Sequence, residues 1–80
     1  MTFTIIDETI KVQFNGLEFT VNILYVDNPK LEACKTATWL KLNGYDAQIV
    51  TESKKDGDVY TVFAFPHDKV CSSRFIQAEQ

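Results

Sequence analysis

The sequence contains few of the residues that mark special structural classes. Its 80 residues include only three glycines, two prolines and two cysteines, which excludes a collagen-like or low-complexity chain. Hydrophobic residues make up 45% of the chain and charged residues 24%. This is the composition of a folded protein and not of a disordered segment. We therefore expect one stand-alone domain spanning residues 1–80.

Disulfides, membrane spans and excess positive charge are equally scarce. Cys34 and Cys71 lie far apart without a metal-binding spacing, and no basic-then-apolar leader precedes them. We expect reduced thiols in a cytoplasmic protein. No apolar run approaches the roughly 20 residues that a membrane span requires. The formal net charge of −3 disfavours a protein held to nucleic acid by counterion release.

Residues 1–26 have the pattern of a β-hairpin. Apolar and polar residues alternate on both sides of Asn15-Gly16, and this dipeptide favours a two-residue type I′ turn. Asp7-Glu8 is expected to be either a bulge or a break in the first strand. The turn predicts three apolar pairs on one face: Phe14 with Leu17, Val12 with Phe19, and Ile10 with Val21.

Residues 29–43 are expected to form a helix. Asn28 is a good N-cap residue, and Pro29 suits the first helical position. Gly44 suits the left-handed position after the helix, where Tyr45 follows it as in a Schellman-type end.

The remaining residues predict a second hairpin over 47–65 and a tail over 66–80. A turn at Asp56-Gly57 would pair Ile49 with Ala64, whereas a three-residue loop would pair Ile49 with Phe63, and we favour the loop. The tail is expected to add a short helix or a weak edge strand. The fold class is therefore α+β, a two-layer sandwich in β-β-α-β-β order with one helix on an antiparallel sheet of two hairpins.

The predicted helix has apolar residues on two stripes. Ala33, Ala37 and Leu40 form the first, and a single sheet cannot easily cover both. The second stripe contains Leu31, Trp39 and Leu42. We expect it to be covered by the tail residues Val70, Phe75 and Ile76, by a second copy of the chain, or by a partner. Trp39 is accordingly either a core residue or an exposed anchor of the kind enriched at interfaces. The second stripe provides the candidate partner-binding residues, which are Trp39, Leu31 and Leu42, with Lys35 at the rim.

Catalytic and metal-binding patterns are weak. His67, Asp68 and Cys71 lie close together, but no anion cradle accompanies them, and turn chemistry explains an adjacent His and Asp. For zinc, His67, Cys71 and Cys34 supply only three plausible ligands, without paired spacing. We expect no enzyme activity, no metal and no cofactor.

These observations favour a small intracellular protein-binding module that acts as an inhibitor or adaptor by docking on a larger protein. Small inhibitors carried by phages or plasmids have this combination of features. One alternative is a homo-oligomeric structural protein, for example a homodimer. It would bury an uncovered face of the second hairpin by symmetry. Another is a weak single-strand nucleic-acid binder, disfavoured by Asp56 and Asp58. Its contacts would be Lys54, Lys55, Tyr60 and Phe63.

Overall fold

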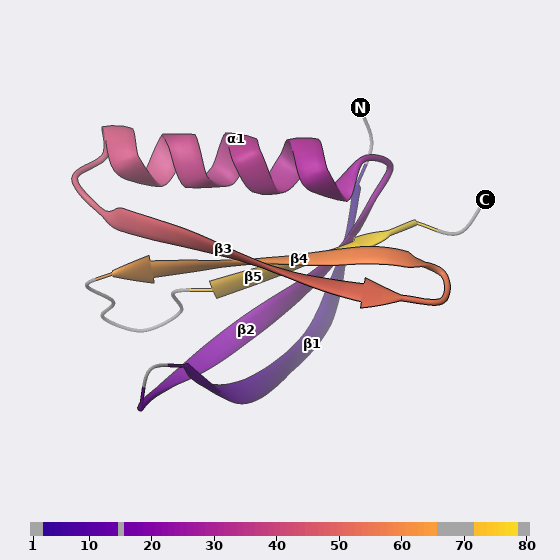
Figure 1. Cartoon of the computed structure of the whole chain (residues 1–80), viewed down its shortest axis with the longest axis horizontal. Coiled ribbons are helices and arrows are strands. Elements are labelled where there is room, and N and C mark those ends of the chain that lie inside the picture. Colours follow the sequence, from indigo (N-terminus) through magenta and orange to yellow (C-terminus); the bar gives the residue numbers. More distant parts are fainter. Residues whose placement is uncertain (1–2, 15, 66–71, 79–80) are drawn as a thin grey trace.

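The computed structural model describes residues 3–14, 16–65 and 72–78. Its strands join one five-stranded sheet in the order β1-β2-β5-β4-β3, and the helix lies over one face of that sheet (Figure 1). The α+β class is confirmed, and the first five elements follow the predicted order. In chain order the elements are β1 (Phe3–Phe14), β2 (Leu17–Val26), α1 (Pro29–Leu42), β3 (Asp46–Lys54), β4 (Gly57–Phe65) and β5 (Ser72–Gln77).

The strand of the tail occupies the centre of the sheet, so the predicted antiparallel sheet of two hairpins is wrong. β5 pairs in parallel with β2 and antiparallel with β4. Since β4 is also antiparallel to β3, β2 and β3 run in the same direction, and α1 is the crossover that parallel strands require. The crossover leaves room for two strands, which β4 and β5 fill. The described part of the tail, residues 72–78, therefore contributes a central strand and not the predicted helix or edge strand.

The first hairpin has the predicted register. Phe14 lies opposite Leu17, and Val12 opposite Phe19. Gly16 has a φ of +78°, a conformation that glycine adopts at low cost. The register shifts between Ile5 and Thr9, so the irregularity at Asp7-Glu8 is a bulge in a continuous strand. Asn15 lies outside the described residues.

The second hairpin differs from both predicted registers. Lys54 pairs with Gly57, and Ile49 therefore faces Val62. Paired residues share a face of the sheet, so this register places Val62 with Ile49 on the helix side. The favoured register would have placed Phe63 and Phe65 with Ile49 on that face. In the structure both rings pack against Phe19 on the opposite face.

The ends of α1 follow the sequence signals. The side chain of Asn28 accepts a hydrogen bond from the Leu31 amide at 3.2 Å, and Pro29 is the first helical residue. At the other end Gly44 has a φ of +86°. Its amide donates to the Lys41 carbonyl at 3.3 Å, and the Tyr45 amide donates to the Leu40 carbonyl at 3.0 Å. These two bonds form the predicted Schellman motif.

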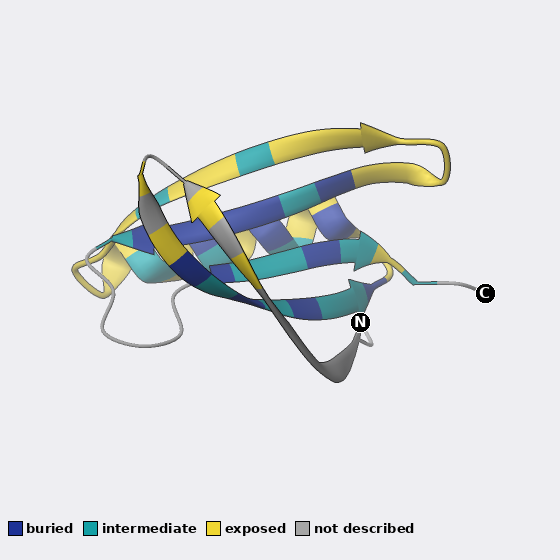
Figure 2. Ribbon diagram, turned by 90° about the horizontal axis from the view of Figure 1, so that it is seen from below, coloured by how far each residue is buried: buried dark blue, intermediate teal, exposed yellow. Residues whose placement is uncertain are grey.

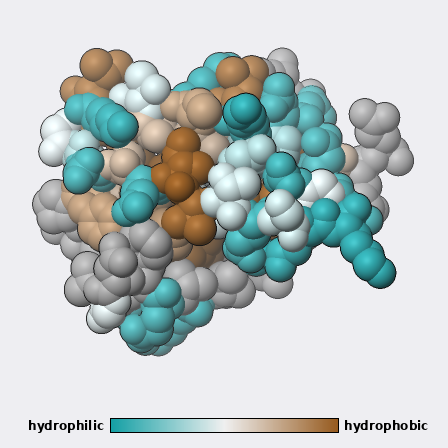
Figure 3. All heavy atoms as spheres, in the orientation of Figure 1, coloured by the Kyte–Doolittle hydropathy of each residue, from teal (hydrophilic) through white to brown (hydrophobic). Residues whose placement is uncertain are grey.

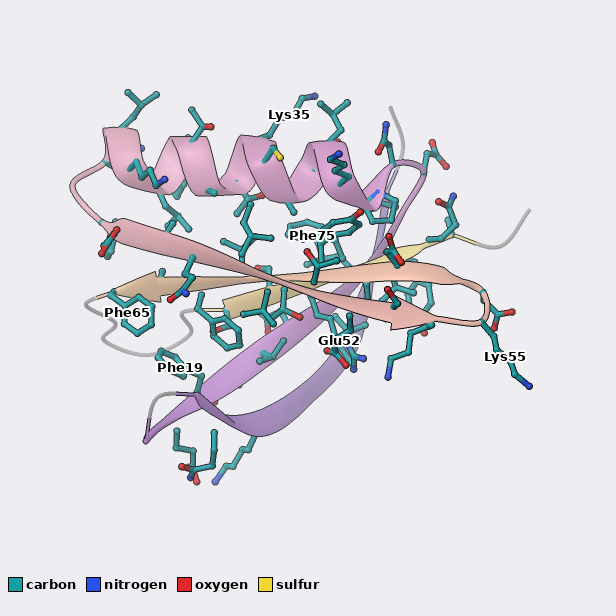
Figure 4. All side chains as sticks on the ribbon, in the orientation of Figure 1. Phe19, Lys35, Glu52, Lys55, Phe65 and Phe75 are labelled. Carbon is teal, nitrogen blue, oxygen red and sulfur yellow. The ribbon has the colours of Figure 1, made fainter. Side chains whose placement is uncertain are left out.

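Two apolar clusters cover the two faces of the sheet. Between α1 and the sheet, Phe75 of β5 packs with Ala33 and Ala37 of the helix. On the other face the β1–β2 hairpin crosses obliquely under β4 (Figure 1). There the Phe19 ring lies 5.4 Å from the rings of Phe63 and Phe65, edge to face with each. Figure 4 shows Phe19 and Phe65 on this lower side and Phe75 directed toward the helix.

Candidate functional site

One face of α1 carries exposed apolar side chains. Leu31 is 40% exposed, Trp39 61% and Leu42 81%. With Lys35, which points away from the sheet in Figure 4, they follow the spacing of a single helical ridge. We call these four residues the α1 outer stripe. All four candidate partner-binding residues therefore lie on one continuous surface.

The opposite face of the helix explains why this stripe faces outward. Ala33 is fully buried and Ala37 is 6% exposed, so small side chains allow the helix to approach the sheet closely. A straight helix can turn only one stripe to a single sheet, and the alanine stripe has that position.

The tail does not cover the stripe within the described residues. Phe75, one of the residues expected to cover it, is 4% exposed and packs beneath the helix with the alanines. Ile76 lies opposite Tyr25 in the β2–β5 pairing, one position along from Phe75, and so faces the other side of the sheet. Val70 lies outside the described residues. Phe75 and Ile76 leave the stripe uncovered because they belong to a central strand of the sheet, and such a strand cannot also cover the outside of the helix.

A shallow depression follows the stripe. It is lined by Cys34, Lys35, Thr38, Trp39 and Leu42. The Thr38 hydroxyl donates to the Cys34 carbonyl at 2.9 Å, which satisfies the only hydroxyl in the depression. Its floor is therefore mainly apolar. Cys34 and Thr38 were not among the predicted contacts, although their positions three residues after Leu31 and Lys35 would have placed them beside the stripe.

Lys35 is the one charged residue among those that line the depression. The Lys35 ammonium lies 4.0 Å from the Glu32 carboxylate, and its side chain remains 57% exposed. Lys30 and Lys41 are exposed on the same helix. Three lysines against one glutamate make α1 a basic element in a chain of net charge −3.

Tyr60 has the one perturbed ionisation in the described residues. Desolvation raises the pKa of its phenol, and the nearby Asp58 carboxylate raises it further. The hydroxyl donates to Asp58 Oδ2 at 3.4 Å. Tyr60 pairs with Phe75 and so shares the helix side of the sheet.

The residues of the predicted nucleic-acid surface are not brought together. Phe63 is 5% exposed. It lies three residues after Tyr60 in β4, and because successive side chains of a strand alternate between faces, the two rings lie on opposite faces of the sheet. The Lys54 ammonium lies 3.4 Å from Glu52, while Lys55 extends from the hairpin tip (Figure 4). A stacking platform made of both rings is therefore absent.

The second hairpin also lacks the uncovered face that the structural alternative required. Val59 and Phe63 are 5% exposed on one side of β4, and Val62 and Ala64 are 1% and 4% exposed on the other. Figure 2 shows β4 largely buried and β3 largely exposed. The apolar surface that remains on this hairpin belongs to the edge strand, where Ile49 is 36% exposed.

The predicted weak catalytic cluster cannot be placed, because His67, Asp68 and Cys71 lie outside the described residues. Within residues 3–14, 16–65 and 72–78 no three His, Cys, Asp or Glu side chains are grouped to hold a metal ion. No helix of these residues is long and apolar enough to cross a membrane. Comparison with protein-family models, curated proteins and solved structures returns no match. The α1 outer stripe is therefore the candidate functional site of the described residues.

Proposed function

We propose that this chain is a small protein-binding module of the cytoplasm that docks on a larger protein through the α1 outer stripe, as an inhibitor or adaptor. The observation that carries the proposal is the exposure of Trp39 next to the exposed side chains of Leu31 and Leu42. A tryptophan that is 61% exposed leaves a large apolar surface in water. Tryptophan is also among the residues that most often dominate binding energy. The proposal takes the fold as a two-layer sandwich whose helix layer is the binding side.

The chemistry of the stripe specifies its partner. An apolar ridge fits an apolar groove, as in other helix-in-groove interfaces. The lysines of α1 favour acidic residues around that groove, because complementary charge speeds encounter and selects partners. We therefore propose a partner with an apolar cleft and an acidic rim. Such a role needs neither a cofactor nor a catalytic group, and it suits a small inhibitor encoded by a phage or another mobile element.

Purified partner and affinity measurements provide the test. Affinity capture from the native cell lysate identifies candidates, and titration calorimetry then compares the wild type with Trp39→Ala. A hot-spot tryptophan contributes at least about 2 kcal/mol. The variant should accordingly bind about 30-fold more weakly.

Tyr45→Ala is the matched control, since Tyr45 is also an aromatic residue, is 38% exposed and follows the helix outside the stripe. It should bind like the wild type. Both variants must retain the circular dichroism of the wild type. Equal affinity of Trp39→Ala and the wild type would refute docking through this stripe, whatever the captured protein is.

A further inference from the structure

The sheet has an open edge at β3. Among the described strands, β3 is the last in the sheet and pairs only with β4, so its outer side presents backbone N–H and C=O groups that no described strand bonds. Its nine residues are exposed or half-buried. Figure 3 looks onto this edge and shows apolar side chains over the middle of β3, with hydrophilic ones toward the hairpin tip. An accessible ladder of this kind is a template for another strand.

The opposite edge has a protective feature that β3 lacks. β1 is interrupted by the bulge between Ile5 and Thr9, and bulges twist an edge away from incoming strands. β3 keeps an unbroken register from the Asp46–Phe65 pair to the Lys54–Gly57 pair. It contains neither proline nor glycine, the residues that would weaken strand addition. Of the two edges, β3 is therefore the one suited to pairing.

The turn of the second hairpin determines which backbone groups face outward. Lys54 and Gly57 close the two-residue turn, and residues that close such a turn direct their backbone groups toward each other. These directions alternate along a strand. A new antiparallel strand can therefore bond only in registers that use the four outward-directed residues, which are Ala47, Ile49, Thr51 and Ser53.

We propose that a second copy of this chain occupies the edge, so that two β3 strands pair antiparallel about a two-fold axis at Val50. This register bonds all four outward-directed residues of each copy and uses the whole strand. It places Asp46 of one copy opposite Lys54 of the second copy at both ends. Opposite charges directly across a ladder stabilise it, and like charges destabilise it. A parallel arrangement would instead bring Asp46 beside Asp46 and Lys54 beside Lys54.

This inference goes beyond the docking function and uses another surface. The α1 outer stripe points away from the sheet and stays free in the paired form. A two-fold axis perpendicular to the joined sheet puts both helices on the same side. The dimer would then present two stripes to a partner with two grooves, and avidity would increase its binding.

Sedimentation equilibrium over a wide concentration series tests the pairing. The wild type should approach twice 9.1 kDa. Lys54→Asp should bring two carboxylates together at each end and raise the dimer dissociation constant about tenfold or more. Asp46→Lys should have the same effect by bringing two lysines together. The double variant Asp46→Lys/Lys54→Asp restores opposite charges and should restore the dimer.

Lys55→Asp makes the same change of charge one residue further along, outside the paired stretch, and should leave the dimer intact. Hydrogen exchange gives an independent readout, because the amides of Ile49 and Thr51 should become protected as concentration rises. All variants are first compared with the wild type by circular dichroism.

Three results would overturn the inference: a wild-type mass of 9.1 kDa at every concentration, a dimer unaffected by the single reversals, or a double variant that fails to recover. A monomer that still binds its partner through Trp39 would overturn the dimer alone. A dimer abolished by Trp39→Ala would show that the α1 outer stripe is the self-association surface, which would contradict this inference and the docking proposal together.

Discussion

Truncation of Phe75 should remove a large part of the stability of the fold. Phe75 belongs to β5, between β2 and β4, and is 4% exposed. Its ring packs with Val26, Ala33, Ala37 and Val62. The side chains of the two alanines are too short to fill the space of the ring, so Phe75→Ala should leave a cavity.

The expected size of the effect follows from these contacts. Replacing a buried phenylalanine by alanine costs about 3–5 kcal/mol. An 80-residue domain has a total free energy of unfolding of about 4–12 kcal/mol, so the variant should lose at least about a quarter of its stability and, at the lower end of that range, should no longer fold. Phe75→Leu keeps most of the volume and should lose less than about 1.5 kcal/mol.

Urea unfolding followed by circular dichroism measures these differences, with an unchanged m-value as the sign that only stability has changed. Leu42→Ala removes an apolar side chain that is 81% exposed and serves as the control, with an expected change within about 0.5 kcal/mol. If Phe75→Ala cost less than about 1 kcal/mol, the tail would be peripheral and the central position of β5 would be wrong.

Three further predictions concern the helix ends, the outer stripe and the phenol on β4. Asn28→Ala removes the acceptor of the Leu31 amide and should lower the free energy of unfolding by about 0.5–2 kcal/mol in the same urea assay. Gly44→Ala should lower it by about 1–2 kcal/mol because Gly44 has a positive φ. Wild-type stability of either variant would contradict the cap assignments. Trp39→Ala should change stability by about 1 kcal/mol or less, since surface substitutions have small effects, and an unfolded variant would show that Trp39 is a core residue. Because the pKa of Tyr60 is raised above its ordinary 10.0, the unfolded chain loses this proton first as pH increases. The free energy of unfolding should therefore be fully retained below pH 10 and decrease as pH rises through the folded pKa, a decline that Tyr60→Phe should reduce in alkaline urea titrations.

Local signals made the first hairpin and the helix predictable. Asn15-Gly16 admits one favourable two-residue turn, and alternation on both sides then sets the register without help from the rest of the chain. The ends of the helix likewise depend on neighbouring residues, namely the Asn28-Pro29 start and the Gly44 stop. In each case the interacting groups are only a few residues apart.

The second hairpin and the tail depend on distant contacts. Ser53 to Asp58 offers several possible turns, and the choice among them decides which β4 side chains face the helix. Val62 packs in the cluster beneath the helix, and Phe63 and Phe65 pack against Phe19 on the other face. β5 has six residues with only two large apolar side chains, a weak strand signal. Its place in the sheet follows from the gap that the β2–α1–β3 crossover leaves, which no local pattern reveals.

The candidate surface was predictable in composition but not in orientation. The sequence shows two apolar stripes on α1, and helical periodicity alone cannot decide which of them faces the sheet. That choice depends on the small side chains of Ala33 and Ala37, which permit close packing, and on the tail strand entering the sheet and not covering Trp39.

Fluorescence of Trp39 provides the most direct test of the docking proposal, because it is the only tryptophan in the chain. In the free protein its emission should be that of a solvent-exposed indole and should be quenched readily by iodide. On addition of the purified partner, the emission should shift to shorter wavelength and become resistant to quenching. Emission that is already shielded in the free monomer, or that stays fully quenchable in the complex, would contradict the account.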